Sequence, residues 1–285
     1  MAIHKYFISL IVVIIFNNSA FANNYSATMR HDDLSILADL HSWYWEFVNF
    51  VEENTKGRSL STTCAKVKEV KGAILCNSYQ RKVMNQMFAR ASIFTEGVFG
   101  REKGSLLATD DRLLSTRARK IRGHDLKKED LEKFLIAVIK KCKENSNYCL
   151  NSAEKQIFKL LTPFINSNDP FVVITFASDG TASYDVIVGH EILHAQYFLE
   201  ENYRESVNTF WKAMTNKEKK RIRKTLSDVY NKEDEFLMIN EFQAYILQST
   251  AYRGKLRKYV TKYRERFMQA LQWKNIEPLQ IILQD

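Results

Sequence analysis

The chain has 285 residues, of which 42 are Lys or Arg and 33 are Asp or Glu, so its formal net charge at pH 7 is +9. Its hydrophobic content of 45% provides ample material for a core and excludes a disordered or low-complexity protein. Only nine Gly and three Pro are present, which predicts long helices and few tight turns.

Residues 1–22 have the pattern of a secretory signal peptide. Lys5 gives a positive start, residues 7–16 form an apolar run, and residues 20–22 (Ala-Phe-Ala) form a small-residue cleavage site. This run is too short for a comfortable membrane span, and no later stretch approaches about 18 uncharged apolar residues. We expect a secreted or periplasmic protein without stable membrane insertion, in which residues 23–285 form a single domain of one or two lobes.

Four cysteines follow the signal segment, at Cys64, Cys76, Cys142 and Cys149. They suit an oxidising compartment, where disulfides form and persist. Three pairings are open, and proximity in the sequence favours Cys64–Cys76 and Cys142–Cys149. Neither pair has the Cys-x-x-Cys spacing of a zinc finger, so two small structural disulfides are expected.

Helical periodicity dominates the rest of the chain. Residues 66–92 are mixed and mostly helical after Ser78, residues 97–100 break the pattern, and residues 101–125 are expected to form an exposed polar connector. Further helices are expected at 33–53, 127–143, 152–161 (stopped near Pro163), 201–214, 216–231 and 253–273.

Residues 170–177 (Pro-Phe-Val-Val-Ile-Thr-Phe-Ala) are the one convincing strand, because they are β-branched and aromatic and are bounded by turn residues. Two further segments, Tyr184–Leu199 and 236–247, are apolar on nearly all sides at helical length. Such helices are buried rather than amphipathic. We therefore expect a mainly α (α+β) fold.

The first of these buried helices contains His190, Glu191 and His194 in the order His-Glu-x-x-His. Histidines four residues apart lie on one face of a helix, where both imidazoles can reach one metal ion. Zinc bound in this way lowers the pKa of a coordinated water to about 7, and the glutamate can accept its proton. A pair of hydrogen-bonded core histidines is the structural alternative, but it leaves Glu191 unexplained.

A catalytic zinc usually has three protein ligands and one open position. The six histidines are at 4, 31, 41, 124, 190 and 194, so any ligand after the motif must be a carboxylate. Most of the downstream acids lie in charged surroundings, whereas Glu241 lies inside the second apolar helix, where an ionised carboxylate needs a cation or several donors. The alternative for Glu241 is a buried ion pair with a Lys or Arg.

The combination of His190-Glu191-x-x-His194 with Asn240-Glu241-x-x-Ala244 resembles the gluzincin metallopeptidases, and its second part is similar to the aminopeptidase N group. The resemblance covers about residues 171–250. It implies a zincin-like fold, with a small β-sheet beside the active-site helix and lobes meeting at the zinc. The implied zinc ligands are His190, His194 and Glu241, and the implied general base is Glu191.

The resemblance also implies that a strand upstream of the motif helix forms the sheet edge that lines the substrate site, although residues 170–177 could equally be buried within the sheet. Some members use a tyrosine to stabilise the oxyanion, for which Tyr245 and Tyr252 are the candidates, with ordinary core packing as the alternative. The gap between His194 and Glu241 is longer than in the best-known members. The glycine-rich substrate-binding motif of the aminopeptidase group is absent, so aminopeptidase activity is not implied.

These features predict an exported, zinc-dependent metallopeptidase that hydrolyses a peptide or protein substrate. A basic helical protein that binds anionic surfaces, with structural zinc or none, is the alternative from another class. Zinc hydrolysis of a non-peptide amide is a third. Because acidic residues alternate with the basic ones and no nucleic-acid-binding motif is present, we expect a solvated basic face and no nucleic-acid partner.

Overall fold

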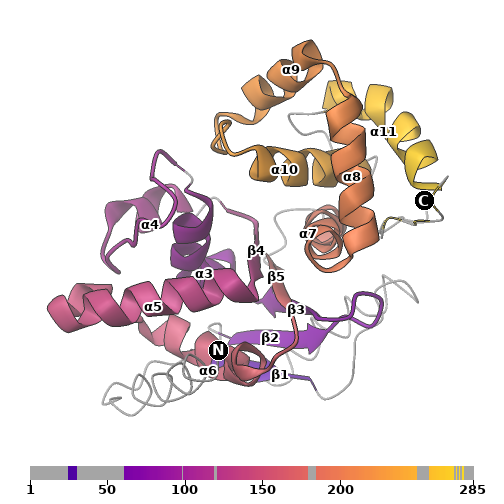
Figure 1. Cartoon of the computed structure of the whole chain (residues 1–285). Coiled ribbons are helices and arrows are strands. Elements are labelled where there is room, and N and C mark those ends of the chain that lie inside the picture. Colours follow the sequence, from indigo (N-terminus) through magenta and orange to yellow (C-terminus); the bar gives the residue numbers. More distant parts are fainter. Residues whose placement is uncertain are drawn as a thin grey trace.

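A mixed five-stranded β-sheet with helices on both faces forms the lower half of the molecule, and a group of helices forms the upper half (Figure 1). This computed structural model describes residues 25–30, 61–97, 99–118, 121–178, 184–248 and 257–272, with residues 274, 276 and 278. The predicted signal peptide, the helix expected at 33–53 and Tyr252 lie outside the described residues. The helix-rich fold with a small sheet is as the sequence predicts.

The sheet has the strand order β1-β2-β3-β5-β4. Its members are β1 (Ser26–Met29), β2 (Ser61–Lys66), β3 (Ala73–Ser78), β4 (Gly123–Lys127) and β5 (Val172–Ala177). The pairs β1–β2 and β3–β5 are parallel, whereas β2–β3 and β4–β5 are antiparallel. The predicted strand at 170–177 is β5, which lies between β3 and β4, so it does not form the sheet edge that the resemblance implies. The outer strand beside it is β4.

The helices largely follow the predicted periodicity. They are α3 (Arg81–Glu96), α4 (Arg112–Thr116), α5 (Lys128–Glu144), the short 3-10 helix η2 (Ser146–Tyr148), α6 (Ser152–Asn166), α7 (Tyr184–Leu199), α8 (Glu201–Ala213), α9 (Asn216–Leu226), α10 (Glu235–Leu247) and α11 (Arg257–Gln272). Capping boxes fix the starts of α6 (Asn151 with Glu154) and α9 (Thr215 with Glu218), where each pair satisfies two backbone N–H groups.

One predicted connector and two predicted helix ends were wrong. The 101–125 segment is not a plain exposed connector, because it contains α4 and the first residues of β4, with His124 only 2% exposed. Helix α6 does not stop near Pro163 but continues to Asn166. Proline removes only one backbone hydrogen bond in that last turn, and burial of Ile165 in the core offsets the loss. Helix α9 ends at Leu226, five residues before the predicted end.

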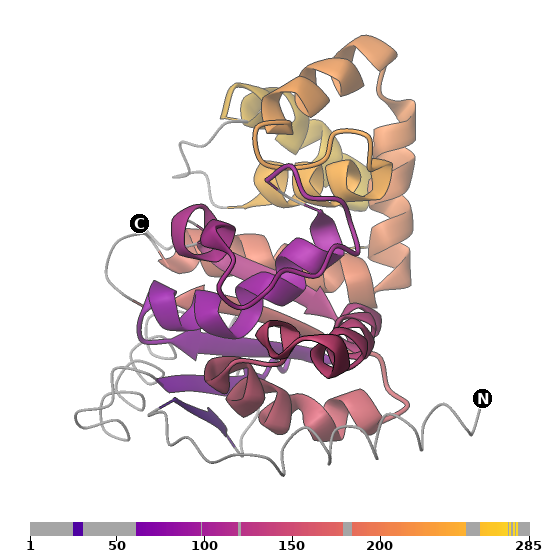
Figure 2. The same cartoon turned by 90° about the vertical axis from the view of Figure 1, so that its left-hand side faces the viewer.

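The two faces of the sheet carry different apolar clusters, because successive residues of a strand point to opposite sides. Helices α3, α5 and α6 pack on one face, where Ile74 and Val173 belong to their cluster. Leu75 and Ile174 point to the other face and pack against α7. Strands β3 and β5 are therefore buried on both sides (Figure 2).

Helix α7 lies between the sheet and the helices of the upper half. Val188, Ile192 and Ala195 pack on the sheet, whereas Leu193 and Tyr197 belong to the cluster formed with α8, α9, α10 and α11. Burial on both sides explains why its sequence is apolar nearly all round. The motif residues His190, Glu191 and His194 lie on the side that faces β4 and α10, whereas the buried Gln196 donates to Glu200 just after the helix.

Both predicted disulfides are present, Cys64–Cys76 and Cys142–Cys149. The first joins residues that lie directly opposite each other on β2 and β3. None of the helices in the described part of the chain has the length and hydrophobicity needed for a membrane crossing.

A buried polar network links β4 to α3 on the sheet face opposite α7. His124 Nδ1 lies 2.7 Å from Ser92 Oγ, and its Nε2 lies 2.9 Å from Asn85 Oδ1. Burial lowers the pKa of His124 to about 3, so its ring is neutral at pH 7. The network is inaccessible and serves to orient β4.

His124 gives a testable pH dependence. Because its folded pKa of about 3 lies below its ordinary value of 6.5, its stabilising contribution is complete above pH 6.5 and is lost as the pH falls toward 3. We expect the difference in unfolding free energy between wild type and His124→Gln to shrink by roughly 3 kcal/mol between pH 7 and pH 4, at about 1.4 kcal/mol per pH unit. Urea denaturation at each pH measures it, and a pH-independent difference would contradict the prediction.

Candidate metal centre

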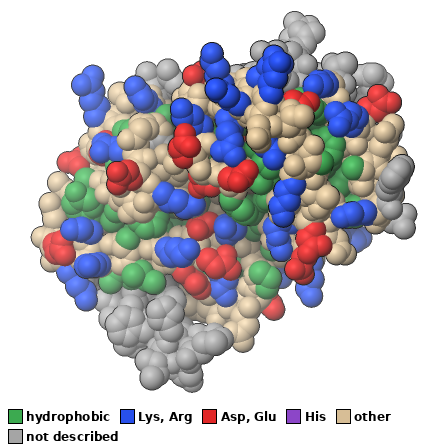
Figure 3. All heavy atoms as spheres, turned by 45° about the horizontal axis from the view of Figure 1, so that its top comes forward, with side chains coloured by type: hydrophobic (Ala, Val, Ile, Leu, Met, Phe, Trp, Pro, Cys, Tyr) green, Lys and Arg blue, Asp and Glu red, His purple; other side chains and the backbone are tan. Residues whose placement is uncertain are grey.

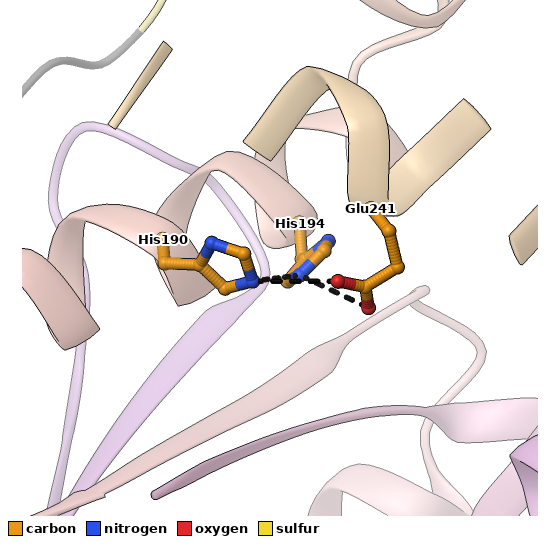
Figure 4. A group of neighbouring side chains, drawn as sticks. All are labelled: His190, His194 and Glu241. Carbon is orange, nitrogen blue, oxygen red and sulfur yellow. Dashed lines mark hydrogen bonds and ion pairs between the residues drawn. The ribbon is translucent and has the colours of Figure 1, made fainter. Parts of the chain in front are cut away.

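The two motif histidines lie one turn apart on α7 and point to a common position (Figure 4). The ring centroids of His190 and His194 are 4.6 Å apart with nearly perpendicular planes, and their Nε2 atoms are 3.0 Å apart. The helical spacing thus brings both ring nitrogens together, as the sequence predicts.

Glu241 reaches the same position from α10 (Figure 4). Its Oε2 lies 3.6 Å from His190 Nε2, and its Oε1 lies 3.7 Å from His194 Nε2. Ligand atoms about 2.0–2.1 Å from a tetrahedral zinc are separated from one another by roughly 3.4 Å. The three observed separations bracket this value, so the group fits a single metal ion.

Burial favours a cation at this position. His190, His194 and Glu241 are 9%, 1% and 4% exposed, and Glu241 Oε2 has no hydrogen-bond partner among the described residues. A hydrogen-bonded histidine pair would leave that oxygen unsatisfied, and a buried carboxylate with one unsatisfied oxygen is costly. No Lys or Arg side chain in the described part of the chain forms an ion pair with Glu241 within 4.0 Å. A divalent cation would satisfy all three side chains together.

The second ring nitrogen of each histidine faces an acceptor. His190 Nδ1 donates to Gln248 Oε1 at 2.9 Å, which leaves Nε2 with a free lone pair. Burial lowers the pKa of His190 to about 4, so the ring is neutral and able to bind a metal. His194 Nδ1 faces Asp125 Oδ2 on β4 at 3.9 Å. Such partners orient metal-binding histidines.

One face of α10 supplies several of these contacts. Glu241, Tyr245 and Gln248 are spaced by four and then three residues, so they lie in one row toward α7. The Tyr245 ring is 4.6 Å from the His190 ring, with an interplanar angle of 62°. Its place beside the metal group is as expected, whereas its role in oxyanion stabilisation stays a prediction.

Glu191 lies beside the histidines and against β4. A methyl carbon built on Gly123 would lie 2.7 Å from Glu191 Cδ and 2.9 Å from its Cγ, so only glycine leaves room for this side chain. Burial raises the pKa of Glu191 well above its usual value, and the negative charges of Asp125, Glu241 and Glu96 raise it further. A divalent cation would oppose this effect, because it would be the largest charge in the site.

Strand β4 supplies functional residues that the sequence does not identify. Gly123, Asp125 and Lys127 alternate along its face toward α7, where they meet Glu191, His194 and Phe198 respectively. No local pattern marks this segment, since its polar residues resemble those of a surface loop. Gln248 was also missed, although its spacing from Glu241 on an apolar helix was a usable signal.

Comparisons with protein-family models, with curated proteins and with solved structures found no match to this chain. The chemistry of the metal group is therefore inferred from its own geometry.

The three ligands predict a definite metal stoichiometry. We expect wild type to bind one zinc ion per chain, and His190→Ala, His194→Ala and Glu241→Ala each to lose most of it, because the remaining two donors hold the ion weakly. Elemental analysis after dialysis measures it. Glu235→Ala is the control, because Glu235 lies on the same helix with its side chain 59% exposed. Full zinc content in Glu241→Ala would exclude that residue as a ligand.

Tyr230 is predicted to support Glu241. Its ring packs against both the upper helical cluster and a cluster of α3 with the 107–118 segment, and its hydrogen bond to Glu241 lowers the pKa of that carboxyl against the larger effect of burial. We expect Tyr230→Phe to weaken zinc binding by about tenfold, the usual effect of losing an outer partner. Competition with a chromogenic chelator measures the affinity.

Tyr263→Phe is the matched control, because the buried Tyr263 donates from its hydroxyl to Glu218 Oε1 on α9 at 2.8 Å and not to a residue of α10. If both variants bind zinc with the same affinity, Tyr230 has no special role at the ligand.

Proposed function

We propose that this protein is a zinc-dependent metallopeptidase of gluzincin type with a zincin-like fold. The observation that carries the proposal is the convergence of His190, His194 and Glu241 with Glu191 beside them. Two histidines and a carboxylate are a donor set of catalytic zinc sites, which keep a further position open for water or substrate. A structural zinc site is instead closed by four protein ligands.

Glu191 is the proposed general base. A bound zinc ion lowers the pKa of water to about 7 and polarises a carbonyl oxygen. The Glu191 carboxylate accepts the proton of the attacking water and can deliver it to the leaving amine. Its raised pKa, caused by burial and by neighbouring acids, favours the first step, because a more basic carboxylate accepts a proton more readily.

A peptide is the favoured substrate because of the strand that borders the site. In the described sheet β4 is an outer strand, paired with β5 on one side. An extended peptide can add to such an edge through backbone hydrogen bonds, which are independent of its sequence. Asp125 and Gly123 of the same strand contact the metal group and the base, so a peptide on this edge would pass beside both.

Tyr245 is the proposed group for stabilising the oxyanion, because it is a hydroxyl-bearing residue beside His190. Thermolysin-like members of the group use a downstream histidine for this purpose, and this chain has none after His194. The proposed role follows the resemblance and the position of the ring.

We also propose that the protein is exported. Residues 1–22 have the features of a signal peptide, and the chain carries two disulfides, which persist in oxidising compartments. On the face shown in Figure 3, Lys and Arg side chains are interspersed with Asp and Glu. This mixture favours a solvated basic surface over a dedicated site for an anionic partner.

Two substitutions separate catalysis from metal binding. We expect Glu191→Gln to retain one zinc per chain and to hydrolyse unfolded protein at least about 100-fold more slowly, because the base is lost while the ligands remain. Gly123→Ala should also retain zinc and lose activity, since the added methyl displaces the Glu191 carboxylate. Release of peptides and metal content are measured on the same samples, with Glu235→Gln as the control.

Equal rates of hydrolysis by wild type and Glu191→Gln would contradict the assignment of Glu191 as the general base. Metal binding without hydrolysis of any unfolded protein or peptide by wild type would refute the peptidase function and leave the metal site standing.

A further inference from the structure

A series of aromatic rings leads away from the metal group along α7. Phe198 follows His194 by one helical turn, and the two rings are 6.5 Å apart with an interplanar angle of 21°. Phe236, at the start of α10, continues the series with its ring 6.1 Å from Phe198 and only 16° from parallel. The rings thus form one aromatic surface, which begins at a metal ligand.

The far end of this surface is open to solvent. Phe236 is 43% exposed, and the only other exposed large hydrophobic residues in the described part of the chain are Tyr79 and Ile136. Neither of these two is part of the aromatic series. Exposure of a phenylalanine ring forgoes the free energy that burial would provide, and apolar surface beside a proposed active site is where a ligand can recover it.

Lys127, the last residue of β4, lies next to this aromatic surface. Its Nζ lies 5.2 Å from the centroid of the Phe198 ring and 5.1 Å from that of Phe236, and it also pairs with Asp130 at 3.5 Å. A chain lying along β4 past Gly123 and Asp125 would therefore reach the two phenylalanines next. The Phe198 ring lies 6.5 Å from the His194 ring, and the Phe236 ring lies a further 6.1 Å from Phe198. At about 3.3 Å per residue of extended chain, these distances correspond to roughly two to four residues.

We propose that Phe198 and Phe236, with Lys127 beside them, bind an aromatic side chain of the substrate two to four residues from the cleaved bond. This inference rests on the proposed peptidase function and adds its substrate preference. Stacked rings favour a further ring at offset or edge geometry, and an ammonium group near that position attracts the face of an aromatic ring. The preference requires a substrate that extends several residues beyond the scissile bond.

The test uses the full-length zinc-loaded protein and internally quenched ten-residue peptides, in which one Phe is moved through each position of a Ser- and Ala-containing sequence. We expect wild type to favour Phe at one position two to four residues from the cleaved bond, by about tenfold in kcat/KM over the Ser peptide. Phe236→Ala should reduce this ratio to near one, and Phe236→Tyr should restore it, because the ring is retained.

Ile136→Ala is the matched control, since Ile136 is also 43% exposed but lies on α5. It should keep the wild-type ratio. Hydrolysis by wild type without an aromatic preference, or an unchanged ratio in Phe236→Ala, would overturn this inference and leave the peptidase function intact. Failure of wild type to cleave any peptide would overturn both.

Discussion

Burial of charge around α7 is the constraint on which the rest of the site depends. The helix is packed on the sheet by Ile192 and on the upper helices by Leu193, so the three motif residues lie on the remaining side, which faces β4 and α10. Several carboxylates gather there, and the pKa values of Glu191, Asp125 and Glu241 are raised, in each case mainly by burial. Carboxylates in such surroundings either hold protons or share a cation. The histidine pair favours the metal ion over the protons. A neutral imidazole nitrogen can bind either a proton or a transition metal, and one metal ion can bind both imidazoles and the carboxylate together.

The parts that could be predicted from the sequence are those encoded at short range. Spacing within one helix predicts that His190 and His194 meet, and the apolar surroundings of Glu241 mark it as a buried acid that needs a partner. The two disulfides join cysteines only 12 and 7 positions apart, which is why proximity in the sequence sufficed to predict the pairs. The histidine spacing and the disulfide pairs can be predicted from one short segment each. The buried position of Glu241 is predicted by the apolar residues around it, which require a positively charged partner or hydrogen-bond donors for the carboxylate.

The rest depends on contacts between distant segments. Strand β4 has polar residues toward α7 because it borders the metal group, so its five residues lack the apolar content of a typical strand. Asp125 belongs to the candidate site because it faces His194, which follows 69 residues later in the sequence. Tyr230 belongs to it because it forms a hydrogen bond with Glu241 on the next helix. Strand β2 likewise pairs with β3 on one side and β1 on the other, through contacts that no local pattern specifies. Local periodicity therefore predicts elements well and their partners poorly.

The position of Glu241 is fixed by packing and hydrogen bonds that do not involve a metal. Gln243 of α10 donates from Nε2 to the backbone oxygen of Leu193 on α7 at 3.2 Å, and it accepts the Tyr203 hydroxyl at 2.6 Å. The first bond holds α10 against α7 and the second holds it against α8, so the third candidate ligand is positioned by the same contacts that build the core. A metal ion at this position would bind without having to order either helix, which favours affinity, since ordering flexible groups opposes binding. The free-energy cost arises during folding, because neighbouring acids must be buried together. Metal binding to the folded protein would offset that cost and so raise the free energy of unfolding.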